Sequence, residues 1–573
     1  MKGGFHAVVG RRITAVLLFF LIAYAVLLGR LFVLQIIYHQ EYLKLASRQH
    51  RLVEEIYPER GIIYAQDKNK NLIPLTLNKT QKILAASPKD IKNPEETASF
   101  LAEKFGVDKE EVLSKISKKD DPYEIILKNI DSDFAEKLSG RLPIGIFFEE
   151  EKQRVYPYGN LAAHLLGFVS KDTDKEEGRY GLERFYNKDF GGEKGVFEGA
   201  KDASGFWIAL GKRIMRPPQN GSNAVLSLDY NIQTKAEEVL NAAKEKWQAA
   251  SAMIIILEPK TGRILALAAS PSFDPNEFAK EKDYSVFLNP AVESMYELGS
   301  VLKPITMAGG LEEKLVKPDT TYEDKGEVKV GGYTVKNFDG KAHDTQTMTQ
   351  VLEKSLNTGA IYVAQLLGKQ KQVEYLKKFG FGEKTNVDLP GEVAGNISNL
   401  LGGSEIEYVT ASFGQGIAVT PLQMAAAIAV IANEGKLMKP YVVDRILDDS
   451  GNETKREPTI VREVISKGTA ETLTKMLVSA VRNGFENRAG VKGYFVAGKT
   501  GTAQIPNENY RGYSDQVIHT FVGYAPAFNP RFLALLQLNK PKGNRFAANT
   551  LTPVFHDLAE YILNYYEIPP DEK

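Results

Sequence analysis

The strongest constraint on this chain is an apolar segment close to its start. Residues 13–29 carry no charge, Arg30 follows them, and apolar character continues over residues 31–37. At a rise of about 1.5 Å per residue the uncharged run is a helix of about 25 Å, and the next turns complete a bilayer span if Arg30 extends to the interface. Ala23-Tyr24-Ala25 resembles a signal-peptide cleavage motif, but the apolar run continues beyond it. We therefore expect an uncleaved single-pass anchor over residues 13–37.

Basic residues flank this segment on both sides. Three precede it and three follow it: Lys2, Arg11 and Arg12, then Lys44, Arg48 and Arg51. Because short cytoplasmic flanks are enriched in Lys and Arg, the first group favours a cytoplasmic tail over residues 1–12, although the second makes the asymmetry modest. On that orientation the chain sits in the cell (inner) membrane, and everything beyond about residue 38 lies outside the cytoplasm.

Composition excludes several classes of protein. A chain of 573 residues predicts several domains. Its 72 basic and 72 acidic residues are balanced, so nothing indicates nucleic-acid binding. There is no cysteine, which excludes disulfides and thiol catalysis, and the seven histidines have no metal-binding spacing. We expect neither a metal site nor a cofactor.

The first extracytoplasmic region, residues 38–220, alternates strand-like runs with charged helical ones. Helices are predicted over residues 93–105 and 109–116, and a solvated loop over residues 118–121. No nucleophile with a partner occurs here, so the region is predicted to be a structural or interaction module. Three polar, loop-like stretches stand among apolar neighbours: Arg60-Gly61-Ile62, Arg154-Val155-Tyr156-Pro157 and Gly181-Leu182-Glu183.

A second domain is predicted to begin after the Pro217-Pro218-Gln219-Asn220-Gly221 boundary. Strand patterns at both of its ends enclose a helical middle over residues 301–433, which indicates an α+β domain with an antiparallel sheet covered by helices. Asp229 is expected to cap the first helix, and Thr552 the last, over residues 553–566. The expected strands are residues 224–228, 252–257, 263–269, 494–497, 520–524 and 532–538.

The chemistry starts with Ser300-x-x-Lys303. Residues three apart share a helix face, so Lys303 is expected to reach the Ser300 hydroxyl. A lysine removes a serine proton at neutral pH only when burial or a neighbouring cation lowers its pKa. By itself the pair is a weak signal, because surface helices produce it by chance.

Two further elements follow in order, Ser355-Leu356-Asn357 and Lys499-Thr500-Gly501-Thr502. This ordered set is found in penicillin-binding proteins and serine β-lactamases. Lys499, if brought close, would lower the pKa of Lys303 by charge repulsion. Ser355 could pass a proton to a leaving amine, and Asn357 could bind a substrate amide.

The third element suits substrate binding. Thr500 and Thr502 offer hydroxyl groups for a carboxylate, and Gly501 would allow close approach of the substrate backbone. The backbone N–H groups of Ser300 and Thr502 would form an oxyanion hole. The strand is expected to end at Gly501. A literal nucleotide-binding match, Gly493-x-x-x-x-Gly498-Lys499-Thr500, is rejected because strand formers fill it and no helix can follow it.

Together these motifs resemble those of a class B penicillin-binding protein, a monofunctional transpeptidase of bacterial cell-wall synthesis. The resemblance spans residues 60–566, and the three polar stretches above resemble the signature of that family's pedestal. Leu298 and Leu356 depart from common family residues without replacing a catalytic group. Further matching segments are Phe379-Gly380-Phe381-Gly382, Leu389-Pro390-Gly391-Glu392, Phe413-Gly414-Gln415-Gly416, Val419-Thr420-Pro421-Leu422-Gln423 and Phe521-Val522-Gly523-Tyr524-Ala525-Pro526.

The resemblance implies a serine acyltransferase acting on peptidoglycan stem peptides that end in D-Ala-D-Ala, acylated by β-lactams at Ser300. It implies a pedestal, the penicillin-binding protein dimerisation domain, over residues 38–220, a transpeptidase domain over residues 221–566 and a tail over residues 567–573. A glycan polymerase of the SEDS family, division-complex proteins and the lipid bilayer are the implied partners. The short link from Thr502 to His519, which contains Gly512-Tyr513-Ser514, favours the division type over the elongation type.

Three alternatives stay open. A membrane-anchored β-lactamase or penicillin sensor shares the motifs, and Glu237-Glu238-Val239-Leu240-Asn241 matches a deacylation pattern in letters, although it precedes Ser300. A catalytically silent scaffold would keep the fold without the chemistry. A carboxypeptidase would use water in place of an amine as the acceptor.

Overall fold

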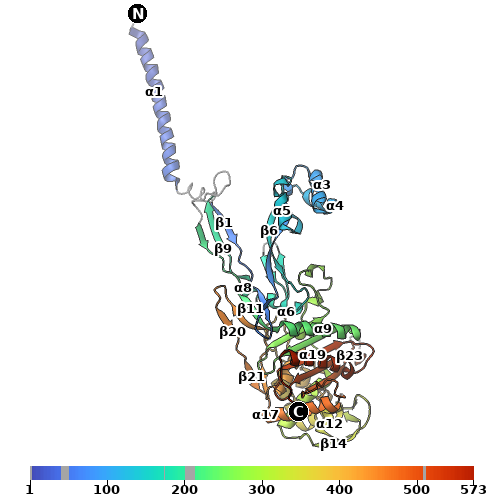
Figure 1. Cartoon of the computed structure of the whole chain (residues 1–573). Helices are drawn as coiled ribbons and strands as arrows, with labels where there is room; N and C mark the ends of the chain where they lie inside the picture. Colours follow the sequence, from blue (N-terminus) through green and yellow to red (C-terminus); the bar gives the residue numbers. More distant parts are fainter. Residues whose placement is uncertain are drawn as a thin grey trace. The chain divides into compact units, whose positions relative to one another are not determined.

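The computed structural model describes residues 3–39, 51–172, 175–200, 213–484, 486–507 and 512–572. Lys2, Lys44 and Arg48, which entered the charge comparison, lie outside these ranges. The chain forms two compact units (Figure 1). One contains residues 1–59 and 192–220, and the other contains residues 60–191 and 221–573.

The first unit contains the predicted anchor. Helix α1 (Gly3–Phe32) continues into a π-helical turn, η1 (Val33–Ile37). The stretch Thr14–Ile37 is long and apolar enough to cross a membrane, and none of its most apolar window is buried by other parts of the protein. The same unit contains a three-stranded antiparallel sheet of β1 (Arg51–Ile56), β9 (Gly195–Ala200) and β10 (Arg213–Arg216).

The second unit begins with a small layered module. Its sheet has β4 (Leu77–Ala86) between β5 (Glu124–Ile130) and β6 (Ile146–Val155), all antiparallel. Helices α3 (Pro94–Phe105), α4 (Lys109–Ile116) and α5 (Ser132–Leu138) cover it and enclose a separate core that includes Leu84, Leu101 and Val112. Both helices predicted here and the loop over residues 118–121 are confirmed.

The three polar stretches singled out in the sequence meet in one buried cluster. Glu183 is fully buried and binds Arg60 Nε at 2.6 Å and Arg154 Nε at 2.8 Å. Arg154 also donates to Asn78 Oδ1 at 2.9 Å and to the Gly61 carbonyl at 2.7 Å. The expectation that these stretches are loops is wrong for two of them. Arg154 lies in the strand β6, one residue before its end, and Glu183 lies on a short helix, α7 (Gly181–Phe185).

A five-stranded antiparallel sheet dominates the rest of the second unit. Its order is β13-β12-β24-β23-β22, so β22 is an edge strand. Helices α9 and α19 pack together against one part of it, and α16 and α17 pack on β12, β22, β23 and β24 (Figure 1). The bounds are β12 (Ser251–Leu257), β13 (Ile264–Ser270), β22 (Ala497–Pro506), β23 (Tyr513–Ala525), β24 (Phe532–Asn539), α9 (Tyr230–Lys246), α16 (Pro421–Ala432), α17 (Lys467–Ser479) and α19 (Thr552–Tyr565).

The local reasons for these helices are visible in the sequence. The Asp229 carboxylate accepts hydrogen bonds from the N–H groups of Asn231 and Ile232 and so caps α9, as predicted. Every residue of α16 is buried, as expected for a helix that is apolar on all sides. The predicted helical middle contains α11 (Lys303–Glu312), α12 (Met348–Glu353), α13 (Asn357–Lys378) and α16, but short hairpins over residues 321–347 interrupt it.

The strand predicted over residues 224–228 joins a different sheet. β11 (Asn223–Asp229) pairs in parallel with β2 (Ile63–Gln66) and antiparallel with β19 (Val443–Leu447). The sheet thus combines segments from before and after the small module, in the order β20-β19-β11-β2-β3, with β20 (Glu453–Lys455) and β3 (Leu72–Pro74) at its edges.

Two predicted boundaries are wrong. Of residues 494–497 only Ala497 lies in a strand, because the Phe495 N–H donates to Asp571 Oδ1 and directs this segment to the C-terminal residues. The strand continues past Gly501 to Pro506, since β23 pairs with it along this length. Thr552 does not cap α19. Its hydroxyl donates to the Ala548 carbonyl of the preceding turn instead.

Candidate active site

Ser300 lies at the start of a buried helix. It belongs to a 3₁₀ turn, η7 (Gly299–Leu302), that continues directly into α11 (Lys303–Glu312). Pro304 occupies the first turn of α11, where its missing N–H costs no hydrogen bond. Gly299 has a φ of +63°, and a Cβ there would lie 3.1 Å from the Thr502 carbonyl. This close approach sets the Ser300 turn directly against strand β22.

Lys303 is 1% exposed and points to Ser355. Its Nζ donates to the Ser355 carbonyl at 2.5 Å and to Ser355 Oγ at 3.2 Å. Within the described residues no hydrogen bond joins Lys303 to Ser300, although the two lie three residues apart at the start of the same helix. The Lys303 amine donates instead to two oxygen atoms of Ser355, the backbone carbonyl and the side-chain hydroxyl.

Ser355 is held in an uncommon backbone conformation. It connects α12 (Met348–Glu353) to α13 (Asn357–Lys378) with a φ of +55°. A non-glycine residue in the left-handed region costs roughly 1 kcal/mol or more and persists only where its surroundings hold it. Here the conformation brings the Ser355 hydroxyl within hydrogen-bond distance of both lysines. Asn357 lines the same cleft, and its Nδ2 donates to the Lys336 carbonyl at 2.9 Å.

Lys499 completes a buried arrangement of two amines around one hydroxyl. It is 1% exposed, and its Nζ donates to Ser355 Oγ at 3.0 Å and to the Thr500 carbonyl at 3.1 Å. Burial lowers the pKa of Lys499 to about 7. Burial, together with the positive charge of Lys499, lowers the pKa of Lys303 well below its ordinary value. Both effects favour the neutral amine of Lys303, which is the form that a general base needs.

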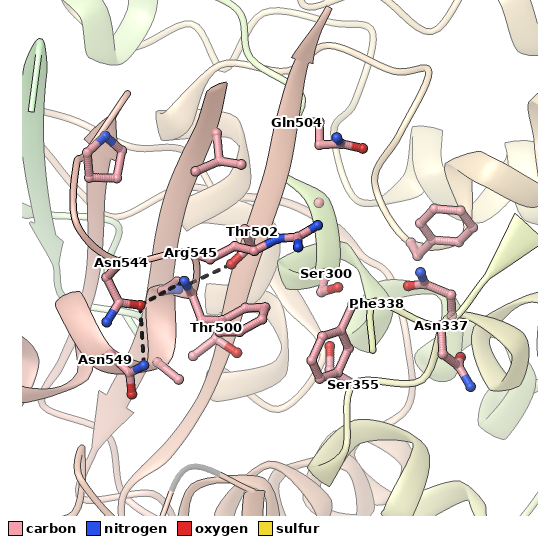
Figure 2. Close-up of a pocket in the computed structure, with 18 of the residues that line it drawn as sticks. Ser300, Asn337, Phe338, Ser355, Thr500, Thr502, Gln504, Asn544, Arg545 and Asn549 are labelled. Atoms are coloured by element: carbon pink, nitrogen blue, oxygen red, sulfur yellow. Dashed lines mark hydrogen bonds between the residues drawn. The ribbon is translucent and has the colours of Figure 1, made fainter. Parts of the chain in front are cut away.

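Strand β22 forms one wall of the cleft. Thr500, Thr502 and Gln504 alternate along it and line the cleft, and Figure 2 shows both threonines on the same side as Ser300 and Ser355. Gly501 has a different role from the one predicted. A Cβ there would lie 2.5 Å from the Leu298 carbonyl and 3.0 Å from Val301, so Gly501 allows close contact with the Ser300 turn and does not line the cleft.

Several residues at the cleft carry no motif and were missed in the sequence. The rings of Phe338 and Phe546 meet edge to face with centroids 5.6 Å apart and belong to segments that both line the cleft. Asn337, beside Phe338, donates from Nδ2 to both carboxylate oxygens of buried Asp324. Thr358, which follows Asn357, donates to the same carboxylate at 2.7 Å. This polar network fixes the cleft wall against the start of α13.

A second missed contact lies just before the serine. The Tyr513 hydroxyl donates to Glu297 Oε2 at 2.9 Å, which links β23 to the segment that carries Ser300. Burial raises the pKa of the Glu297 carboxyl. The Glu237 of the deacylation-like pattern lies elsewhere, on α9, where it accepts from the Ala162 N–H at 2.7 Å and from Gln233. Glu237 does not line the cleft and offers no activation of a water there.

Comparisons with known proteins agree with this arrangement. A family profile described as penicillin binding protein transpeptidase domain matches residues 252–560, and one described as penicillin-binding protein dimerisation domain matches residues 55–226. Stage V sporulation protein D of Bacillus subtilis is 32% identical over 557 residues, covering 96% of this chain and 85% of the relative. Peptidoglycan D,D-transpeptidase FtsI of Buchnera aphidicola is 28% identical, covering 98% of this chain and 96% of the relative.

A solved structure supports the same likeness. Penicillin binding protein 3 from Mycobacterium tuberculosis, complexed with aztreonam, superposes with a TM-score of 0.71 at 27% identity. The match covers 90% of this chain and 98% of that chain.

Proposed function

Because this chain belongs to the class B penicillin-binding proteins and is a peptidoglycan D,D-transpeptidase with a serine acyl-enzyme, we propose that Ser300 is its nucleophile and Lys303 its general base. One observation carries this assignment. Lys303 and Lys499, both buried, converge on the Ser355 hydroxyl beside Ser300. A lysine kept neutral next to a serine at the head of a helix is suited to acyl transfer.

Acylation follows from these positions. Ser300 Oγ attacks the carbonyl carbon of the penultimate D-Ala, and its proton passes to the neutral Lys303 amine. The N–H groups of Ser300 and Thr502 stabilise the oxyanion. As the C–N bond breaks, the proton returns through the Ser355 hydroxyl to the departing D-Ala amine. Thr500 and Thr502, with the Lys499 cation, bind the terminal carboxylate, and Asn357 binds a backbone amide of the peptide.

Deacylation reverses the same steps with a different amine. An amine from a neighbouring stem peptide attacks the ester, its proton returns through Lys303 to Ser300 Oγ, and the new amide is the cross-link. In a β-lactam the amide C–N bond that breaks is part of a ring. The leaving amine therefore stays attached to the acyl group and blocks the cleft, which makes the adduct long-lived.

The wider setting follows from the anchor. The apolar helix over Thr14–Ile37 is long enough to cross a bilayer and supports a single-pass membrane anchor. With the basic residues before it on the cytoplasmic side, the transpeptidase domain would face the compartment where peptidoglycan is built. A SEDS-family glycan polymerase is the partner proposed for the anchor and the pedestal, with division-complex proteins around it. The relative named FtsI supports a role in division.

Intact-mass spectrometry of the purified chain after incubation with benzylpenicillin tests the assignment. We expect one stable adduct per chain, mapped to the peptide that contains Ser300. Ser300→Ala should remove it entirely while the chain keeps its thermal unfolding transition. Rapid loss of the adduct with turnover of the drug would indicate a β-lactamase, and no adduct on the folded wild type would indicate a silent scaffold.

A further inference from the structure

A guanidinium group without a partner points into the cleft. Arg545 lies on the loop between β24 and α18 (Ala547–Thr550) and is exposed. Figure 2 shows its side chain extending across β22 between Thr502 and Gln504, on the side that faces Ser300. Within the described ranges of the chain, the Arg545 guanidinium forms neither an ion pair nor a hydrogen bond. A cation in this position can bind an anionic group of whatever occupies the cleft.

The backbone that carries Arg545 is fixed. Its carbonyl oxygen accepts a hydrogen bond from Nε2 of His519 at 3.1 Å, and the Ala547 N–H donates to Thr502 Oγ1 at 3.2 Å. His519 is fully buried, and burial lowers its pKa to about 4, so the ring is neutral at pH 7. A neutral ring has one N–H donor, which the Arg545 carbonyl uses, and one acceptor, which faces the Thr550 hydroxyl at 2.9 Å. These hydrogen bonds therefore hold the backbone of Arg545 beside β22, and its side chain starts from a fixed point at the cleft.

The direction of the bound peptide decides which part of it Arg545 meets. In the proposed reaction the scissile carbonyl lies between Ser300 and Thr502, and the terminal carboxylate lies toward Thr500. The part of the donor that precedes the scissile bond then runs toward Gln504 along the free edge of β22, where an extended peptide can add as a strand. Thr502 and Gln504 are about 7 Å apart along the strand, which is one side-chain step on the same face.

We propose that Arg545 is a specificity-determining residue that binds a free side-chain carboxylate on the residue immediately preceding the D-Ala-D-Ala of the donor peptide. This inference rests on the proposed function and names the substrate class of the same site. The planar guanidinium matches a carboxylate through two parallel hydrogen bonds, and an amide or an amine at that position could not form this ion pair. Donor peptides with a carboxylate at this position are therefore preferred.

The test compares two synthetic donor peptides ending in D-Ala-D-Ala. They differ in one group, a free carboxylate or a primary carboxamide on the side chain of the preceding residue. D-Ala release by the full chain in detergent is followed over a single turnover without an acceptor amine, so that only the donor side contributes. We expect the wild type to favour the acid by about tenfold in kcat/KM. Arg545→Gln should abolish this preference, and Arg545→Glu should reverse it.

The matched control is Lys542→Gln, which removes an exposed charge of the same sign from the same loop. It should keep the preference, and an equal loss in this variant would overturn the assignment to Arg545. Titration with benzylpenicillin gives the concentration of competent sites in each preparation. Equal rates for the two donors in a wild type that titrates fully would overturn this inference alone. A wild type that does not titrate would overturn the proposed function.

Discussion

The molecule buries charge in two places and in opposite ways. In the cluster of Arg60, Arg154 and Glu183, each charged side chain is at most 4% exposed, and the carboxylate lies between two guanidinium groups. At the active site, Lys303 and Lys499 are equally buried, and both amines donate hydrogen bonds to the Ser355 hydroxyl and to backbone carbonyl oxygens.

The consequence is visible in the pKa values. Burial by itself would raise the pKa of Glu183, but Arg154 and Arg60 outweigh it and lower the value, so the carboxylate stays charged. At the two lysines burial acts in the other direction and lowers the pKa of each amine, and the positive charge of Lys499 lowers the pKa of Lys303 further. The same cost of desolvation is thus outweighed by ion pairs in one region and lowers the pKa of two amines in the other.

Replacing Lys303 with Met should give the largest effect, a loss of acylation without a loss of stability. We expect the acylation rate with benzylpenicillin to fall by about 10²–10⁴-fold, because the general base is lost while the volume is kept. The free energy of unfolding at pH 7 should rise by about 1 kcal/mol, since a buried amine with a lowered pKa destabilises the fold below its unfolded pKa. Time-resolved acylation assays measure the rate, and urea unfolding measures the free energy of unfolding. An unchanged acylation rate would exclude Lys303 as the base.

Replacing Glu183 with Gln should have the opposite effect, a loss of stability with little change in the acylation rate. Two buried guanidinium groups would lose their counter-ion, and we expect a loss of about 3–5 kcal/mol in the free energy of unfolding. The fraction that is folded at low temperature should still be acylated within about twofold of the wild-type rate, because the cluster touches no group of the cleft.

The matched control is Glu177→Gln. Glu177 pairs with Arg179 at 3.3 Å, but both side chains are more than 40% exposed. We expect a change of less than about 1 kcal/mol, since solvent screens such pairs. If both variants lost the same stability, burial would not be the reason for the contribution of Glu183.

The smallest expected effect is a shift in pH dependence. The wild-type acylation rate should fall as the pH falls through the pKa of Lys303, because the protonated amine cannot accept the Ser300 proton. Lys499→Gln removes the cation that helps to lower this pKa, so the acid limb should move to higher pH. Acylation rates between pH 5 and 9 measure the limb, and a shift to lower pH would contradict the coupling of the two lysines.

Stability should also separate the two regions by pH. The folded pKa of Lys499 lies below its unfolded value of 10.5, so stability rises with pH between about 7 and 10.5 as the unfolded chain alone binds the proton. Glu183 affects stability in the acid range. Its pKa is lowered in the folded protein, so it adds stability that is lost as the pH falls below about 4.5. The Lys499→Gln variant should flatten the alkaline rise and leave the acid loss unchanged.

What could be predicted from the sequence was local. The apolar anchor, the helices of residues 93–105 and 109–116, and the Asp229 cap follow from periodicity and side-chain chemistry within a few residues. The sequence indicated acyl-transfer chemistry, because the order and spacing of a motif are visible along the chain. The residues concerned are Ser300, Lys303, Ser355, Asn357 and Lys499. The Thr552 cap failed where a neighbouring turn offered its hydroxyl another acceptor.

Only the tertiary structure decided how distant groups meet. Lys303 donates a hydrogen bond to Ser355. Gly501 packs closely against the turn that carries Ser300. Glu183 forms ion pairs with two arginines that are far away in the sequence. Nothing in the pattern of Lys540-Pro541-Lys542-Gly543-Asn544-Arg545 indicated that this segment lines the cleft. Contacts of this kind depend on how sheets and helices pack, and the free energy of a buried charge depends on what surrounds it in three dimensions. The sequence by itself therefore determined the family motifs and their order, and the fold determined which atoms they meet and the direction in which burial moves their pKa values.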